Sequence, residues 1–245
     1  GTNRMYIRGD RICGRTWEVY KRNRYQSKIK DGKIVKRKRG DRVQVTKEEV
    51  QRYNQKMRER KLTRKLNANF AEGDLYLTLT YTRDNRPSPP DAEKNLRKFI
   101  ACLKRMYRKT DTEFKWVSTT EIGTRGGIHH HLVIPYYADV REIEQKWRRY
   151  GGHVKMQTLY GQNFEKIATY IAKTDTKEGT ASRSSYSCSR NLVDPPEKQK
   201  KVKANSWREM PTVPKGWALE KDSLVIGVNP VTGHGYQFYR LVQIE

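Results

Sequence analysis

Apolar residues recur through the middle of the chain at two spacings, one typical of strands and one typical of helices. Residues 75–81 alternate apolar side chains with Thr or Tyr, which predicts a β-strand. Prolines between positions 87 and 90 break this pattern, and Asp91 is expected to cap a helix whose apolar residues follow at helical spacing. Further strands are predicted at 114–120, 128–134 and 154–158, with one helix capped by Asp139 and another running from a cap at Asn163 to about Lys173.

The order of these elements indicates the fold class. Strands 114–120 and 128–134 follow one another directly and are joined by a turn containing Gly126 and Gly127, which predicts an antiparallel pair. The other strands alternate with helices. We therefore expect an α+β fold, with a mostly antiparallel central sheet and helices packed on it.

The N-terminal region, residues 1–70, is expected to be an ordered basic arm that binds DNA. It holds 23 Lys and Arg against 7 Asp and Glu, so it carries +16 of the net charge of +25. Asp31-Gly32 predicts a hairpin turn, and Thr46 to Glu49 form a capping-box pattern. The helix that follows is very basic and has a narrow apolar stripe at Val50, Tyr53, Met57 and Leu66. The alternative is a solvated, disordered basic tail.

The C-terminal region, residues 176–245, is expected to be a linker and an accessory segment. Residues 174–206 are polar and contain Pro195-Pro196, which predicts a loop. Residues 224–228 and 236–242 flank a loop with Asn229-Pro230 and Gly233, which predicts a β-hairpin. Residues 71–175 are then the core domain.

The net charge of +25 concerns the partners of the protein. An excess of this size favours a polyanion, with nucleic acid as the first candidate and an anionic membrane surface as the second. No apolar run is long enough to span a bilayer, so a soluble, cytoplasmic protein is expected. The three cysteines form no C-x-x-C pair, and no phosphate-binding G-x-x-x-x-G-K loop of a nucleotide-driven motor occurs.

A cluster of candidate metal ligands lies between Glu121 and His131. On a strand, His129 and His131 point to one face and His130 points to the other. Antiparallel pairing across the Gly-rich turn would bring Glu121 beside the two histidines. Two imidazoles and one carboxylate suit a divalent ion such as Mn²⁺ or Mg²⁺ that keeps positions open for water and substrate. The alternative is a structural or incidental run of histidines.

A candidate nucleophile lies on the helix that follows. Tyr170 lies roughly 100° from the middle of the helix's apolar face, since there are about 3.6 residues per turn. Lys166 and Lys173 are four and three residues away, so their charges favour the phenolate. A flanking Tyr on an amphipathic helix is common, and this segment alone is weak support. Tyr160 precedes the helix and is a poorer candidate.

Together, the histidine pair and the Tyr-x-x-Lys helix resemble the motifs of the HUH endonuclease superfamily, and within it the replication initiators of phages and plasmids. Residues 75–81 look like the first motif of that superfamily. Glu121, His129 and His131 match its second motif and third metal ligand, and Tyr170 and Lys173 match its third motif. The resemblance covers about residues 71–175 and implies a ferredoxin-like split βαβ core. The middle position of the histidine motif is His130 instead of an apolar residue, which leaves open which two histidines bind.

The resemblance implies metal-dependent nicking and rejoining of single-stranded DNA. The metal would bind the scissile phosphate and Tyr170 would attack it, giving a 5′-phosphotyrosine link and a free 3′-OH. Lys173 would lower the pKa of the Tyr or stabilise charge on phosphate. Phosphate contacts are expected from a set of basic residues: Arg22, Arg24, Arg37, Lys38, Arg39 and Lys166.

The expected partners are single-stranded DNA at an origin or nick site, a host helicase and a polymerase. A helicase would have to be recruited because the chain has no helicase domain of its own. Three alternatives remain open: a single-Tyr transposase, an initiator that binds an origin without cutting it, and a non-catalytic nucleic-acid-binding protein. Because Lys accompanies Tyr170, where small transposases usually have Gln, a replication initiator is favoured.

Overall fold

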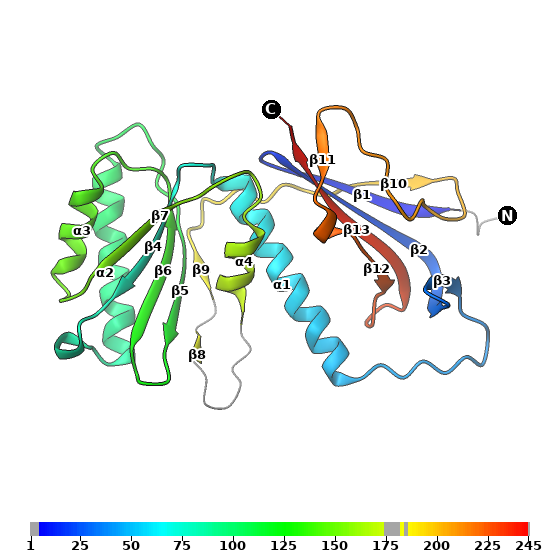
Figure 1. Cartoon of the computed structure of the whole chain (residues 1–245), viewed down its shortest axis with the longest axis horizontal. Helices are drawn as coiled ribbons and strands as arrows, with labels where there is room; N and C mark the ends of the chain where they lie inside the picture. The colour runs from blue at the N-terminus through cyan, green and yellow to red at the C-terminus, as the bar shows by residue number, and fades with distance from the viewer. Residues whose placement is uncertain (1–4, 174–181, 184–185, 245) are drawn as a thin grey trace. The chain divides into compact units, whose positions relative to one another are not determined.

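The computed structural model describes residues 5–173, 182–183 and 186–244, and Figure 1 shows the chain. The chain divides into two compact units, one formed by Gly1–Ala68 with Asp194–Glu245 and the other by Asn69–Val193. Each unit is built on its own antiparallel sheet. The predicted α+β class, with mostly antiparallel pairing, is confirmed.

These units differ from the three predicted segments 1–70, 71–175 and 176–245. Strand β2 (Thr16–Lys30) of the N-terminal region pairs along most of its length with β13 (His234–Gln243). The two regions therefore share one sheet and do not form a separate arm and accessory segment. Their predicted roles in DNA binding and cleavage stay predictions.

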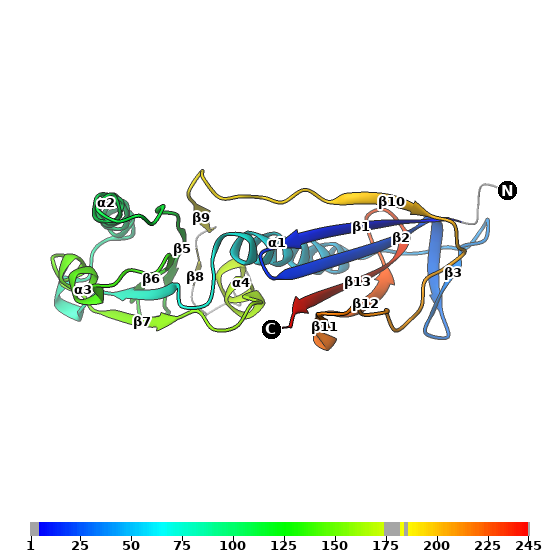
Figure 2. The same cartoon turned by 90° about the horizontal axis from the view of Figure 1, so that it is seen from above.

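The first unit contains a sheet of order β10-β1-β2-β13-β11, with β3 paired to β2 and β12 paired to β13. Figure 2 shows these strands from above, with helix α1 beside them. The remaining elements of this unit have the following bounds: β1 Tyr6–Cys13, β3 Lys33–Lys36, α1 Lys47–Asn69, β10 Lys198–Val202, β11 Trp217–Leu219, the 3₁₀ helix η2 Lys221–Ser223, and β12 Val225–Val228.

Three local predictions in this unit are confirmed. Asp31 and Gly32 join β2 and β3 with positive φ angles of 50° and 71°, as a tight hairpin turn requires. Glu49 N donates to Thr46 Oγ1 and Thr46 N donates to a carboxylate oxygen of Glu49, so the capping box closes in both directions. The C-terminal hairpin is formed by β12 and β13.

Helix α1 buries a less apolar face than its stripe predicted. Leu66 is buried, whereas Val50, Tyr53 and Met57 are only half-buried. Arg60 is also buried, with its guanidinium 3.7 Å from the centre of the Phe238 ring. A cation on an aromatic face keeps favourable electrostatics after losing water, which explains how a basic residue occupies a packing position.

The second unit has a sheet of order β7-β4-β6-β5-β8, with β9 paired to β5. Its elements have the following bounds: β4 Leu75–Thr80, the 3₁₀ helix η1 Arg83–Asn85, α2 Pro89–Tyr107, β5 Val117–Ile122, β6 Ile128–Ile134, α3 Val140–Arg148, β7 Val154–Thr158, α4 Glu165–Ala172, β8 Ser182–Arg183 and β9 Ser187–Cys188. From β4 to β7 the order is βαββαβ, and the neighbours in the order β7-β4-β6-β5 pair antiparallel. This is a split βαβ arrangement.

One face of this sheet carries the main apolar core of the unit. Helices α2 and α3 lie next to each other on it (Figure 1), and their inner residues pack with the alternate residues of β4 and β6. Leu79, Phe99, Leu132 and Trp147 are all fully buried there. Across the described part of the chain, none of the helices is both long and apolar enough for a bilayer span.

Helix ends follow the prediction at one site and depart from it at two. Asp139 caps α3 by accepting from Glu142 N. The cap of α2 is Ser88 and not Asp91, because Pro89 and Pro90, which lack an N–H, occupy the first helical positions. The cap of α4 is Phe164, one residue beyond Asn163, although Asn163 Oδ1 still accepts from Glu165 N.

The predicted loop over 174–206 is only partly correct. Residues 174–181 and 184–185 lie outside the described residues. The rest includes β9, which pairs with β5, and β10, which extends the first sheet beside β1. Strand β10 is a polar Lys-rich edge strand, so its sequence lacks the apolar alternation by which strands are recognised.

Candidate functional site

The histidine motif lies on β6, the strand between β4 and β5. Glu121 is directly opposite His129 across the β5–β6 pair, and Thr119 is opposite His131. Alternation along the strand therefore puts Glu121, His129 and His131 on one face of the sheet. His131 is 4 % exposed, whereas His129 is exposed at the end of the strand.

His130 faces the opposite side and belongs to the core. Its Nε2 is 2.9 Å from the Tyr81 hydroxyl and its Nδ1 is 2.8 Å from Thr120 Oγ1, and its ring lies edge-on to that of Trp147. Burial, together with the nearby imidazoles of His131 and His129, lowers the pKa of His130 to about 4. His130 is thus a neutral core residue, bonded at both nitrogens, on the face away from Glu121.

Glu121 connects the histidine motif to the candidate nucleophile. The Tyr170 hydroxyl donates to Glu121 Oε2 at 2.9 Å, and the same oxygen is 3.2 Å from His131 Nε2. The Tyr170 and His131 rings meet edge-on with centroids 5.1 Å apart. Helix α4 therefore lies on the sheet face opposite α3, with the Tyr170 side chain still 41 % exposed. Residues far apart in the sequence meet here through one carboxylate.

The placement of Tyr170 follows from the amphipathic pattern of α4. Phe164, Ala168 and Ile171 are buried, so the helix is fixed by its apolar face. Tyr170 lies on the flank of that face and reaches back to the end of β5. The apolar face of this helix is confirmed, while the identity of Tyr170 as a nucleophile stays a prediction.

Tyr76 is a further site residue that the sequence reasoning missed. Its hydroxyl is 3.0 Å from His131 Nδ1, and the two rings stack with centroids 5.9 Å apart. Tyr76 alternates with Thr78 and Thr80 on β4, and Thr78 pairs with His131. That polar alternation was the available signal, but it becomes specific only when the register between β4 and β6 is known.

The predicted lysines do not join this network among the described residues. Lys173 is exposed and follows α4 in an extended conformation, and Lys166 is exposed one turn before Tyr170. Neither side chain forms an ion pair within the described ranges. Their charges are close in sequence to Tyr170, and their roles stay predictions.

Arg86 lies near His129 and was not predicted. Its Nη1 donates to the carbonyl of Arg125 in the β5–β6 turn, at 2.8 Å. A Cβ added at Gly127 would lie 4.0 Å from Arg86 Nη2 and 3.9 Å from His129 Nε2, so guanidinium and imidazole both border this glycine. An exposed guanidinium beside the histidine motif is well placed to contact a phosphate.

The residue types fit a divalent cation, but their side chains as placed do not form a complete cluster. Glu121 and His131 are in contact, while His129 points elsewhere, and within the described ranges no group of three His, Cys, Asp or Glu side chains could hold a metal ion. The donor set thus fits in chemistry and in face, and its completion requires a different His129 rotamer, which an exposed side chain adopts readily.

The predicted DNA contacts of the N-terminal region lie in the first unit. Arg22 and Arg24 are on β2, and Arg37, Lys38 and Arg39 follow β3. Arg24, Lys38 and Arg39 are exposed, and Arg22 and Arg37 are half-buried. The structure places none of them in the unit that carries Tyr170, and their DNA contacts stay predictions.

The comparisons with known proteins bear on the second unit. Residues 74–178 match the model of a family described as Replication-associated protein ORF2. This match supports a replication-initiator family and a role in replication initiation. It spans the strands of the histidine motif and helix α4, so the similarity coincides with the candidate site. No curated protein and no solved structure matches the chain.

Proposed function

We propose that this protein is an endonuclease of the HUH superfamily that nicks and rejoins single-stranded DNA through Tyr170, and so initiates rolling-circle replication. The observation that carries the proposal is the convergence of Tyr170, Glu121 and His131 on one sheet face, with the Tyr170 hydroxyl 2.9 Å from the carboxylate. The family match over residues 74–178 supports the replication context.

The contact between Tyr170 and Glu121 suggests how the nucleophile is activated. The Tyr170 hydroxyl donates its proton to Glu121 Oε2 as its oxygen attacks phosphorus. The P–O3′ bond breaks, the 5′-phosphate becomes linked to the Tyr170 oxygen, and the released 3′-oxygen takes up a proton. A later attack by a 3′-OH on this link restores the phosphodiester and returns the Tyr170 hydroxyl. No nucleotide cofactor is consumed.

The proposed cofactor is Mn²⁺ or Mg²⁺, held by His129, His131 and Glu121. When bound, a divalent cation supplies a Lewis acid that polarises the scissile phosphate and fixes its position. His131 is held for this role by Tyr76, and the half-open position of Tyr170 allows a DNA strand to approach. Lys173, Lys166 and Arg86 would contact phosphate oxygens near the nick.

The free 3′-OH is the end that a polymerase extends, which ties the proposed chemistry to replication. Host polymerase and helicase are the proposed partners. The N-terminal basic residues would add a further hold on DNA through phosphate contacts, which carry most sequence-independent affinity.

A second candidate function is origin binding without cleavage. The incomplete metal cluster favours it, because His129 does not join Glu121 and His131 among the described residues. Such a protein would bind DNA with strong salt dependence and would form no covalent product.

The test is formation of a covalent protein–DNA adduct. The full chain would be incubated with Mn²⁺ and a labelled pool of random single-stranded DNA, then separated on a denaturing gel. We expect an SDS-resistant band of reduced mobility that disappears with EDTA and in Tyr170→Phe. Tyr160→Phe is the matched control, because Tyr160 is 87 % exposed and precedes the same helix.

Each other outcome changes a specific part of the proposal. A band that survives in Tyr170→Phe and disappears in Tyr160→Phe would move the nucleophile. A band that survives EDTA would remove the cation from the mechanism. No band with any pool, alongside tight salt-sensitive binding, would replace the nuclease with the origin-binding function.

A further inference from the structure

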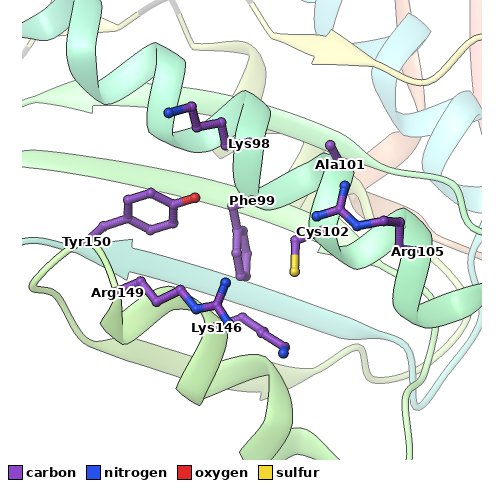
Figure 3. A pocket seen from close by; sticks show the side chains of 8 residues that line it. All are labelled: Lys98, Phe99, Ala101, Cys102, Arg105, Lys146, Arg149 and Tyr150. Carbon is purple, nitrogen blue, oxygen red and sulfur yellow. The ribbon is translucent and has the colours of Figure 1, made fainter.

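A basic groove lies between α2 and α3, in the second unit. Figure 3 shows the residues around it, with Lys98 and Arg105 from α2 on one side and Lys146 and Arg149 from α3 and its end on the other. The cavity measures about 260 Å³. Lys98, Arg105 and Arg149 are exposed and Lys146 is half-buried, so the charged ends are open to solvent.

The lining of this groove is charged with a single sign. Phe99, Ala101, Cys102 and Tyr150 complete it, and no Asp or Glu is among the described residues that line it. In the described part of the chain, none of the four cations forms an ion pair. Like charges gathered around one cavity repel each other, and this repulsion is relieved when an anion enters. The groove is therefore complementary to a negatively charged ligand.

The floor and rim of the groove have an aromatic component. Phe99 is fully buried beneath it, and Tyr150 is half-buried at its edge. Burial raises the pKa of Tyr150 and a nearby Cys102 adds to this effect, while Arg149 and Arg105 oppose it. The Tyr150 hydroxyl thus remains protonated and can donate to an acceptor. Cations beside an aromatic ring are the usual surface for single-stranded nucleic acid, where phosphates meet the charges and bases meet the ring.

This groove is separate from the candidate active site. Trp147 of α3 packs against His130, which points to the sheet face opposite Glu121 and Tyr170. The groove therefore lies on the helix-covered side of the sheet, and Tyr170 lies on the other side. A strand in the groove is not the strand segment that meets the nucleophile.

We propose that the groove between α2 and α3 binds the sugar-phosphate backbone of a single DNA strand, as a second DNA contact apart from the scissile phosphate. It rests on the proposed function only in taking DNA as the polyanion. The contact would hold a part of the strand that flanks the nick, and would matter for binding and not for the chemical step.

The test compares two variants of the full chain that differ only in where charge is removed. The groove variant carries Lys98→Gln, Arg105→Gln, Lys146→Gln and Arg149→Gln. The matched variant carries Arg97→Gln, Lys104→Gln, Arg141→Gln and Arg148→Gln, which lie on the same two helices but do not line the groove. Affinity for a fluorescent oligothymidine is measured by anisotropy in EDTA over a range of salt concentrations.

We expect the groove variant to lose affinity by roughly 10²- to 10³-fold at 0.1 M salt, with the slope of log K against log salt reduced by about 3, since each phosphate contact to a single strand contributes about 0.7. The matched variant should keep most of the affinity and slope. A duplex of the same length should show a smaller difference between the two variants. Thermal unfolding of both variants checks that they are folded.

Equal losses in the two variants would overturn the proposal, because binding would then follow net charge alone. No loss in the groove variant would overturn it as well, and an equal effect on duplex would overturn the assignment to a single strand. Covalent adduct formation at saturating DNA separates this result from the proposed function. A groove variant that still forms the adduct supports a binding role, and a wild type without adduct but with the groove effect leaves the groove standing without the nuclease.

Discussion

Tyr76 is expected to prepare His131 for a metal ion by fixing which ring nitrogen carries the proton. The Tyr76 oxygen is 3.0 Å from His131 Nδ1, and Glu121 Oε2 is 3.2 Å from Nε2 on the other side of the ring. If Nδ1–H donates to Tyr76, the Nε2 lone pair faces Glu121 and is ready to bind a cation. Tyr76→Phe keeps the stacked ring and removes the acceptor, so the proton moves to Nε2 and donates to Glu121.

The size of the effect follows from the role of such partners. Loss of a hydrogen bond that orients a metal-binding histidine typically costs roughly 10- to 100-fold in metal affinity. This corresponds to about 1.4 to 2.7 kcal/mol of binding free energy, because each factor of ten is about 1.4 kcal/mol. We expect Tyr76→Phe to weaken Mn²⁺ binding within this range.

The assay is Mn²⁺ titration of the full chain by calorimetry, without DNA. Tyr81→Phe is the control, because it removes the same hydroxyl from a tyrosine that bonds to His130 on the opposite sheet face. Mn²⁺ affinity should fall in Tyr76→Phe and stay unchanged in Tyr81→Phe. Equal affinity in wild type and Tyr76→Phe would refute the reasoning about the tautomer, and would leave the adduct test of Tyr170 unaffected.

Three further predictions concern stability, each measured by urea denaturation in EDTA. Gly152→Ala should lower the free energy of unfolding by about 3 kcal/mol, since its Cβ would lie 1.7 Å from the Thr80 carbonyl oxygen; wild-type stability would contradict this placement. His130, whose pKa is lowered to about 4 by burial, is protonated more readily in the unfolded chain. The free energy of unfolding should therefore fall as pH drops from about 6.5 to 4, by up to about 3 kcal/mol. His130→Asn should lose this part of the pH dependence, and an identical pH profile in both proteins would contradict the assignment. Thr46→Ala should cost about 1 kcal/mol because it opens the capping box of α1, whereas Thr112→Ala, in an exposed loop, should cost less.

Local patterns were sufficient for much of the second unit. Strands at 128–134 and 154–158 were predicted with the bounds that the structure shows, because both are alternating or apolar runs between clear turn residues. The opposite orientations of His130 and His131 followed from strand alternation alone. Antiparallel pairing across the Gly-rich turn correctly placed Glu121 opposite His129.

Features that depend on distant partners could not be predicted from local patterns. Nothing in β2 or β13 taken alone indicates that they pair, since their register is set by packing and not by neighbouring residues. The contact between Tyr170 and Glu121 depends on where α4 docks, which amphipathicity indicates only as a face. The direction of the exposed His129 side chain is not set by packing, and no local pattern indicates it.

The division into units has a consequence for how the chain folds. The second unit, Asn69–Val193, interrupts the first one in sequence, and β13 pairs with β2 only after the whole of the second unit has been synthesised. At the boundary, the Asn69 side chain accepts from Val193 N at 2.7 Å and donates to Val193 O at 2.8 Å, which joins the two ends of the second unit.

A ribosome would thus release a complete second unit while β1 and β2 still lack their partner. Closing a loop costs more entropy as the loop lengthens, and the intervening segment is long. Once the second unit has folded and Asn69 holds Val193, the chain between β2 and β13 behaves as a much shorter connection. Early folding of the second unit would in this way lower the entropic cost of assembling the sheet whose strands flank it in sequence.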